Sequence, residues 1–348
     1  MNEKLGIIAI IVETGSGDTI KSINELLHED RDIIVGRLGI PYPKRGLSLI
    51  SIVVDGEQDK IQCPFRQTRH ARRRHRTHHS CRRSMIETIF KKIDEGRGLE
   101  REDLRYLLEN RETVEEAVFE KARALTERHF HRKIYVRGLI EFTNYCHNNC
   151  YYCGIRRDND EVARYRLTTE EMEAAVAVGA EAGFQTFVLH GGEDADFTDE
   201  RLADWLERIK KIQPGCAITL SVGERSRQSY ARLKEAGADR FLLRHETYDP
   251  EHYKKLHPKE MDRDRRLACL YELKAMGYQV GSGFMVGSPY QSTENLVEDF
   301  MFLQKLQPAM IGIGPYVRHH ATPFRDFENG SVELTAMCIA ILRLLFPT

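Results

Sequence analysis

The sequence lacks the features of a membrane or secreted protein. No apolar run in its 348 residues approaches the ~18 residues of a membrane-spanning helix, and no signal peptide precedes the first apolar stretch. Its eight cysteines do not form a disulfide framework, because three lie close together and five are scattered singly. We therefore expect a cytoplasmic protein with free thiols and no membrane partner. The scattered cysteines are Cys63, Cys81, Cys216, Cys269 and Cys338, and the last three are expected in the core.

Net charge is also nearly absent, at −1, but this balance conceals one strongly basic segment. Residues 64–84 contain eight arginines and no acidic residue, and they lack the periodicity and caps of a helix. A basic arm for nucleic acid is one interpretation; translation in the wrong reading frame is the one that we favour. Met85 opens a well-formed helix, as the start of a second gene would. Residues 63–84 are therefore expected to be a disordered or frameshifted linker, and nucleic acid is not an expected partner.

The segment before this linker, residues 1–62, has the pattern of a small α+β module. Apolar β runs cover 5–12, 32–37 and 47–56, and residues 18–28 carry apolar side chains at helical spacing. This β-α-β-β order predicts an incomplete ferredoxin-like or ACT-like domain of unknown ligand. The run 36–42 (Gly-Arg-Leu-Gly-Ile-Pro-Tyr) resembles the small regulators found beside iron-only hydrogenase systems.

After the linker, the pattern changes to helices and then to repeated strand–helix units. Residues 85–133 are expected to be helical, and 134–348 alternate strands with helices, which predicts a parallel sheet with α-helical crossovers. Six strands are expected where a complete (β/α)8 barrel has eight, so we expect a C-terminally incomplete TIM-type barrel. A doubly wound sheet is the alternative, weakened by the lack of G-x-G-x-x-G after the first strand. The expected strands are 134–142, 185–190, 217–222, 240–244, 279–286 and 310–314.

A fourth regularly spaced cysteine is missing beside the three clustered ones, and the functional prediction depends on this absence. Cys146, Cys150 and Cys153 follow the first barrel strand with the spacing Cys-x3-Cys-x2-Cys-Gly. Three thiolates can hold three irons of a [4Fe–4S] cluster, which leaves the fourth iron open for reaction chemistry. A structural zinc loop and three buried thiols without metal are the alternatives. Zinc sites usually pair two short hooks, and no second hook lies at a suitable distance.

Polar residues at the ends of the following strands are candidate ligand-binding groups. The second barrel strand ends in 190–193 (His-Gly-Gly-Glu), where paired glycines allow close backbone approach and a carboxylate can receive an ammonium group. Ser221 ends the third strand, and 244–247 (Arg-His-Glu-Thr) ends the fourth. Arg266 could bind a carboxylate through its forked guanidinium, or it is a solvated helix charge. Each group alone has a structural explanation, such as a turn or an ion pair. Their coincidence at successive strand ends favours a site.

Taken together, these motifs resemble the radical SAM superfamily and, within it, the HydE family of [FeFe]-hydrogenase maturases. The matching runs, within about residues 85–348, are 140–144, 153–159, 164–166, 235–240, 243–247 and 312–315. The resemblance implies a [4Fe–4S] cluster on Cys146, Cys150 and Cys153, with S-adenosyl-L-methionine (SAM) bound at the open iron. The implied SAM contacts are Tyr152, Gly192, Glu193, Ser221, Glu246 and Arg266. The implied substrate cavity is lined by Arg137, Thr219 and Ile313, and no catalytic side chain is assigned.

The same resemblance implies an activity, the reductive cleavage of SAM to a 5′-deoxyadenosyl radical during assembly of the hydrogenase H-cluster. The implied partners are a small organometallic or amino-acid-derived substrate, a reductant such as ferredoxin or flavodoxin, and other hydrogenase maturases including a GTPase scaffold. Methylornithine synthase and biotin synthase share the cysteine spacing and remain alternatives. An alternative of a different class is an inactive barrel fragment joined to a regulatory, ligand-binding module.

Overall fold

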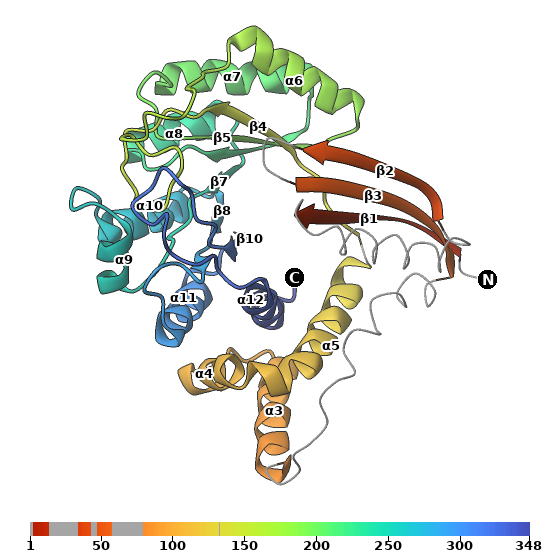
Figure 1. Cartoon of the computed structure of the whole chain (residues 1–348). Helices are drawn as coiled ribbons and strands as arrows, with labels where there is room; N and C mark the ends of the chain where they lie inside the picture. The colour runs from red at the N-terminus through yellow and green to blue at the C-terminus, as the bar shows by residue number, and fades with distance from the viewer. Residues whose placement is uncertain (1–2, 14–33, 43–46, 58–78, 132) are drawn as a thin grey trace. The chain divides into compact units, whose positions relative to one another are not determined.

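The computed structural model of the chain divides into two compact units, Met1–His79 and Ser80–Thr348, which are described separately (Figure 1). The structure describes residues 3–13, 34–42, 47–57, 79–131 and 133–348. The helix expected at 18–28 and residues 63–78 of the basic segment lie outside the described residues. The frameshift interpretation and the completeness of the ACT-like module therefore stay predictions.

In the first unit, the described strands form an antiparallel sheet with β3 at its centre. β1 (Glu3–Glu13) and β2 (Ile34–Tyr42) both pair with β3 (Leu47–Glu57). Ile and Val recur in β1 and β3, and such β-branched residues favour extended backbone. The strands predicted at 5–12 and 47–56 are confirmed, and the one predicted at 32–37 is found at Ile34–Tyr42, so it extends further than predicted.

Three helices open the second unit: α3 (His79–Asp94), α4 (Arg101–Glu109) and α5 (Arg111–Phe130). α3 begins inside the segment predicted as a linker, so the last residues of that segment are helical. α4 and α5 pack with α11 (Thr293–Leu306) and α12 (Val332–Leu345) around a second apolar core that includes Leu104 and Phe300.

A six-stranded parallel sheet forms the centre of this unit, in the order β10-β8-β7-β6-β5-β4. Within this sheet, each strand pairs with the sheet strand that comes before or after it along the chain. The order therefore never reverses as it does in a doubly wound sheet. The six predicted strands and the barrel-type order are confirmed, and the described strands leave β4 and β10 as the two edges. The strands are β4 (Gly138–Thr143), β5 (Thr186–Gly191), β6 (Ala217–Ser221), β7 (Arg240–Leu242), β8 (Gln279–Ser282) and β10 (Met310–Ile311).

Helices follow the strands and cover the outer side of this curved sheet (Figure 1). A capping box formed by Thr168 and Glu171 opens α6, with each side chain accepting from the other residue's amide. Gly237 and Gly277 follow their helices at φ 110° and 75°, as is common at helix C-termini. The helices are α6 (Thr169–Glu181), α7 (Asp199–Ile212), α8 (Arg227–Glu235), α9 (Pro250–Leu256) and α10 (Arg263–Ala275). β9 (Met285–Val286) and β11 (Gly314–Pro315) pair beyond the ends of β8 and β10.

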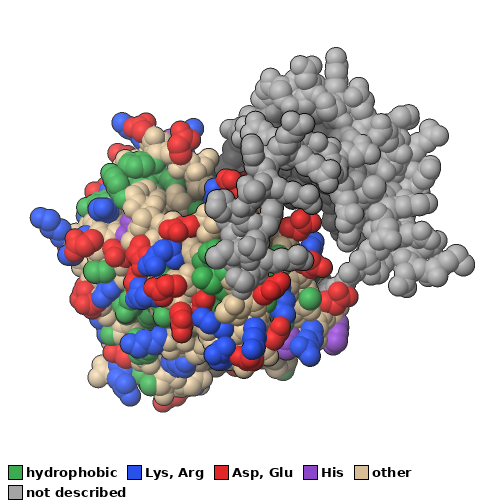
Figure 2. All heavy atoms as spheres, turned by 90° about the horizontal axis from the view of Figure 1, so that it is seen from below, with side chains coloured by type: hydrophobic (Ala, Val, Ile, Leu, Met, Phe, Trp, Pro, Cys, Tyr) green, Lys and Arg blue, Asp and Glu red, His purple; other side chains and the backbone are tan. Residues whose placement is uncertain are grey.

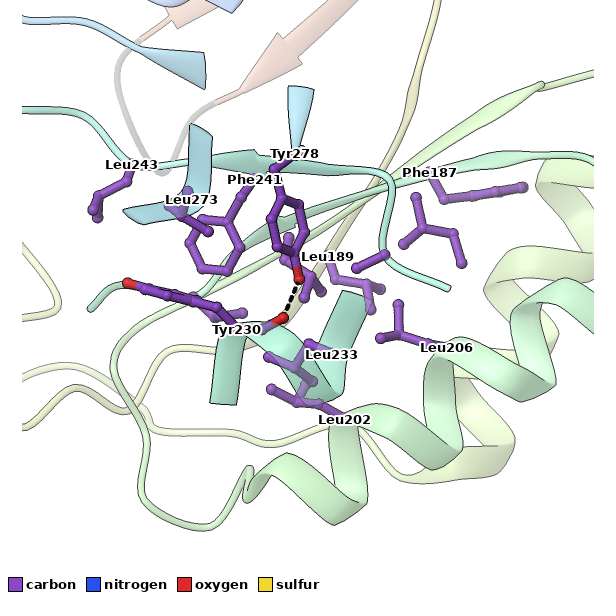
Figure 3. Packing of buried hydrophobic residues seen from close by; sticks show 14 of the residues in the cluster. Phe187, Leu189, Leu202, Leu206, Tyr230, Leu233, Phe241, Leu243, Leu273 and Tyr278 are labelled. Atoms are coloured by element: carbon purple, nitrogen blue, oxygen red, sulfur yellow. Dashed lines mark hydrogen bonds between the residues drawn. The ribbon is translucent and has the colours of Figure 1, made fainter. Parts of the chain in front are cut away.

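The main core lies between the sheet and these helices (Figure 3). Phe187 and Leu189 of β5 meet Leu206 of α7, and the Tyr278 hydroxyl donates to the Tyr230 carbonyl at 2.7 Å. Because side chains alternate along a strand, His190 of β5 points to the opposite, inner face. The predicted burial of cysteines in the cores is confirmed for Cys216, Cys269 and Cys338.

The described surface carries charges of both signs. Lysine and arginine are interspersed with acidic side chains on the face shown in Figure 2. Within the described ranges, no helix has the length and apolar character to cross a membrane.

Candidate cluster and cofactor site

The three clustered cysteines lie in the loop after β4, at the C-terminal end of the parallel sheet. All three are half-buried and unpaired with other cysteines. Burial raises the pKa of Cys150 to about 12 and that of Cys153 to about 11, and it also raises the pKa of Cys146. The thiols disfavour one another's ionisation, because a charge on one repels a charge on the next. Such a trio suits a positively charged metal group, which stabilises thiolates.

The cysteines are not arranged around a single point. Among the residues that the structure describes, no three His, Cys, Asp or Glu side chains are placed to hold one metal ion. Cysteines of an iron–sulfur cluster bind different irons, so they need to surround a group rather than converge on an atom. The loop carries three thiols within eight residues, as binding to three irons requires.

Arg164 holds the cysteine loop in shape, a role that the sequence alone did not reveal. Its guanidinium donates to four backbone carbonyls, those of Asn144, Ile155 (3.0 Å), Arg156 (2.7 Å) and Asn159 (2.9 Å). Asn144 precedes the cysteines and the other three follow them, so one side chain joins the two ends of the loop.

We expect Arg164→Lys to weaken retention of the cluster. An ammonium group lacks the planar fork that reaches several carbonyls at once, so the loop ends would separate. Affinity for the cluster should fall roughly 10–100-fold, the usual cost of losing an outer-shell partner at a metal site, and the iron content measured after gel filtration should therefore be lower. Arg157→Lys, in an exposed arginine of the same loop, is the matched control. Unchanged iron content in Arg164→Lys would show that other contacts hold the loop.

The glycine pair after β5 places Glu193 against the cysteine loop. A Cβ atom at Gly192 would collide with the carbonyl oxygen of Tyr145, so only glycine allows this approach. The Glu193 amide donates to the Cys146 Sγ at 3.4 Å. Gly223, at φ 73°, likewise leaves the space that the Glu193 side chain fills. Gly192 and Gly223 therefore both help to position the Glu193 carboxylate beside the cysteines.

Arg266 of α10 is the buried positive centre of the site, and it is not a solvated helix charge. It is only 8% exposed. Its Nη2 lies 3.7 Å from Glu193 Oε1, its Nε lies 3.1 Å from Glu224 Oε1, and its Nη1 donates to the Arg244 carbonyl at 3.2 Å. Burial opposes its charge, but Tyr253, Glu224 and Glu193 around it raise its pKa overall. Arg266 therefore joins the ends of β5, β6 and β7.

Glu224 is a member of this site that sequence reasoning missed. Burial raises its pKa, while Arg266 lowers it and Glu193 raises it. Its signal in the sequence was its place three residues after Ser221, at the end of β6.

Buried polar atoms without a hydrogen bond lie on β6 and just after β7. Within the described part of the chain, Thr219 Oγ1 and Arg244 Nε are buried and have no hydrogen-bond partner. Arg244 Nη2 and Glu246 Oε2 also lack hydrogen bonds, but they lie 3.3 Å apart as an ion pair. Glu246 adopts φ 64°, a strained conformation for a residue with a side chain. Because buried polar groups are normally paired, this rim fits a polar ligand.

The remaining predicted site residues differ in how near they lie to the cysteine loop and the strand ends. Ser221 Oγ shares a 2.9 Å hydrogen bond with His190 Nδ1, next to the same rim. Ile313 is half-buried between β10 and β11 and packs on the second core. Arg137 is exposed and precedes β4, so it lies roughly 20 Å along the strand from the cysteine loop. The structure brings the cysteines, Gly192, Glu193, Glu246 and Arg266 together, and it does not bring Arg137 to them.

Tyr152 is anchored by a buried histidine. Its hydroxyl lies 3.1 Å from His257 Nε2, and His257 Nδ1 lies 3.0 Å from the Tyr253 carbonyl. Nδ1 therefore carries the proton, and Nε2 accepts from Tyr152. Burial, and then the charge of Arg266, lowers the pKa of His257 to about 3.

We expect His257 to make the second unit less stable in acid. As pH falls through ~6.5, the unfolded chain binds a proton at this histidine, while the folded protein binds none until about pH 3. Folded-state stability is therefore lost as pH falls, by about 2 kcal/mol at pH 5. His257→Gln, whose amide can replace both contacts, should lose that much less between pH 7 and pH 5 in urea unfolding. Identical pH dependence of the two proteins would contradict this assignment.

The fold and this site together define a radical SAM enzyme, with a three-cysteine loop, a Gly-Gly-Glu turn and charged strand ends on a barrel-type sheet. The radical SAM superfamily profile matches residues 140–303, and the profile of iron-only hydrogenase system regulators matches residues 4–63. The chain is 41% identical over 260 residues to the [FeFe] hydrogenase maturase subunit HydE of Thermotoga maritima, covering 74% of each chain. It belongs to the HydE-like family of radical SAM enzymes and carries an N-terminal hydrogenase system regulator domain. The resemblance found in the sequence is confirmed.

Other relatives share the same domain. 3-Methylornithine synthase of Methanosarcina acetivorans is 30% identical over 266 residues, which are 75% of each chain. The crystal structure of methylornithine synthase superposes with a TM-score of 0.68 at 29% identity, covering 74% of this chain and 76% of that one. The structure of the maturase HydG, at 24% identity and a TM-score of 0.67, covers 76% of this chain and 62% of that one and supports the fold alone.

Proposed function

We propose that the second unit binds a [4Fe–4S] cluster on Cys146, Cys150 and Cys153 and SAM beside it. The observation that carries the proposal is Arg266, which links Glu193 beside the cysteine loop to the strand ends where unpaired polar atoms gather. When bound, the cluster and SAM supply a 5′-deoxyadenosyl radical once one electron is delivered.

The charges of the rim suit SAM, whose sulfonium and ammonium groups are positive. Three carboxylates (Glu193, Glu224 and Glu246) face two guanidinium groups (Arg244 and Arg266), so the rim has an excess of negative charge. Arg266 holds Glu193 and Glu224 in fixed positions, which orients an ammonium group without rearrangement. The proposed SAM contacts are Tyr152, Gly192, Glu193, Ser221, Glu246 and Arg266.

The inner face of the sheet supplies the proposed substrate cavity. Thr219 is 2% exposed, and its hydroxyl has no hydrogen-bond partner among the described residues, so it is available to a substrate. Arg244, one strand away, adds a half-buried guanidinium, with Nε and Nη2 buried, that suits an anionic group. Ile313 would contribute an apolar wall. Arg137 has the least support, because it is exposed at the other end of β4.

The proposed biological role is maturation of [FeFe]-hydrogenase, on a small organometallic or amino-acid-derived substrate. It is supported by the 41% identity to HydE and by the hydrogenase system regulator domain in the same chain. The role requires a reductant, such as ferredoxin or flavodoxin, and other maturases including a GTPase scaffold. A methylornithine synthase activity is the second candidate, supported by the relative and the solved structure of that name.

Anaerobic reconstitution tests both parts of the proposal, the binding of the cluster and SAM and the biological role. The full chain, loaded with iron and sulfide, should show [4Fe–4S] absorption and release 5′-deoxyadenosine from SAM under dithionite. Hydrogenase activation in a purified maturation mixture lacking HydE would then assign the role, and formation of 3-methylornithine would assign the alternative. Absence of the absorption and of SAM cleavage would leave only the regulatory domain with a function.

A further inference from the structure

A groove on the surface of the second unit borders the cysteine loop. Its volume is about 510 Å³, and it is lined by Tyr151, Lys254, Lys255, Tyr290, Pro323 and Phe324. Tyr151 is bonded directly to Cys150, so the wall of the groove is the outer side of the loop that we assign to the cluster.

The groove is physically tied to the cysteines through α9 and the residues after it. The Tyr151 amide donates to the Leu256 carbonyl at 2.9 Å, at the end of the helix that carries Lys254 and Lys255. Cys150 Sγ lies 3.5 Å from Met261 Sδ, in the loop after that helix. A molecule seated in the groove would therefore sit against the shell that surrounds the cysteines.

The lining combines aromatic rings with positive charge. The Tyr151 and Tyr290 rings both meet Phe324 edge-on, at 6.1 Å and 6.2 Å between ring centres. Lys255 Nζ lies 5.4 Å from the centre of the Tyr290 ring, and none of the described residues that line the groove is acidic. Lys254 pairs with Glu251 at 2.6 Å on the exposed side of α9. Tyr290 is 56% exposed and Tyr151 is half-buried, whereas Phe324 is buried. Aromatic residues are enriched in protein interfaces.

We propose that this groove is the docking site of an acidic electron-transfer protein, which donates one electron from its reduced cofactor to the bound cluster. The inference rests on the proposed function, because only a redox-active group at the cysteines gives an electron donor reason to dock here. Lys255, and Lys254 with a charge that Glu251 partly offsets, attract an acidic surface and raise the rate of encounter. The Tyr151 and Tyr290 rings supply the apolar contact, and docking at Tyr151 brings the donor's cofactor to the residue next to Cys150.

The test compares two charge reversals in the full, cluster-loaded chain. Lys254→Glu/Lys255→Glu changes the groove, and Lys91→Glu/Lys305→Glu makes the same change at exposed lysines of α3 and α11. The probe is an acidic flavodoxin, whose Kd is measured by calorimetry at low salt. We expect the groove variant to bind at least ~10-fold more weakly, as reversal of interfacial charges does, and the control variant to bind within ~2-fold of the unsubstituted chain.

Rates of cluster reduction separate this inference from the proposed function. Reduction by flavodoxin should slow in the groove variant, while reduction by dithionite should stay unchanged. Tyr290→Asn tests the apolar part, because asparagine tolerates the φ of 65° found at Tyr290 better than tyrosine does. Equal flavodoxin affinity in the groove and control variants would overturn the docking site. Failure of the unsubstituted chain to accept electrons from dithionite would instead overturn the proposed function.

Discussion

Cys150→Ala is expected to abolish both [4Fe–4S] absorption and SAM cleavage while leaving the far-ultraviolet circular dichroism unchanged. Cys150 is half-buried in a loop and belongs to no core cluster, so its loss should cost little folding energy. Its thiolate, however, would supply one of three iron ligands, and two ligands cannot hold the cluster against chelation. Iron content, the visible spectrum and 5′-deoxyadenosine release are the measurements.

Cys216→Ala is the matched control for this experiment. Cys216 is 1% exposed within the main core, so its substitution should reduce thermal stability but leave iron content and SAM cleavage intact. If Cys150→Ala retained a cleaving cluster, the assignment of the cysteine loop would be wrong.

Arg266→Leu is expected to damage both stability and SAM binding. It would leave the Glu193 and Glu224 carboxylates without their buried partner, a change that typically costs about 3–5 kcal/mol of unfolding free energy. SAM affinity of the cluster-loaded protein should fall roughly 10–100-fold, as expected when hydrogen bonds between charged groups are lost. Urea unfolding and equilibrium dialysis with SAM measure the two effects.

Two variants distinguish the loss of the buried Arg266 charge from a general destabilisation of α10. Arg265→Leu removes the neighbouring arginine, which pairs with Glu272 at 3.3 Å on a more exposed side of the helix, and it should change SAM affinity little. Arg266→Lys keeps the charge without the fork, so it should retain most of the stability but not the affinity. Wild-type SAM affinity in Arg266→Lys would show that Arg266 acts only on the fold.

Much of the architecture could be predicted because it depends on local patterns. Apolar periodicity located the strands of the barrel-type sheet. The strand boundaries were predicted less accurately. The first barrel strand was predicted from residue 134 but begins at Gly138. The prediction was wrong for residues 134–136 because they are apolar, as strand residues often are, yet they are exposed and lie outside the sheet.

The candidate site, too, could be predicted only in part from the sequence. The sequence by itself determined the cysteine trio, the Gly-Gly-Glu turn and the family, because these reside in short contiguous motifs. Only the tertiary structure decided that Arg266 is a buried centre between Glu193 and Glu224, that Arg164 closes the cysteine loop, and that Arg137 lies far from both. The physical reason is that the environment of a charged side chain depends on which strand ends converge around it, and the residues that meet there are separated by 20 to 73 positions in the chain.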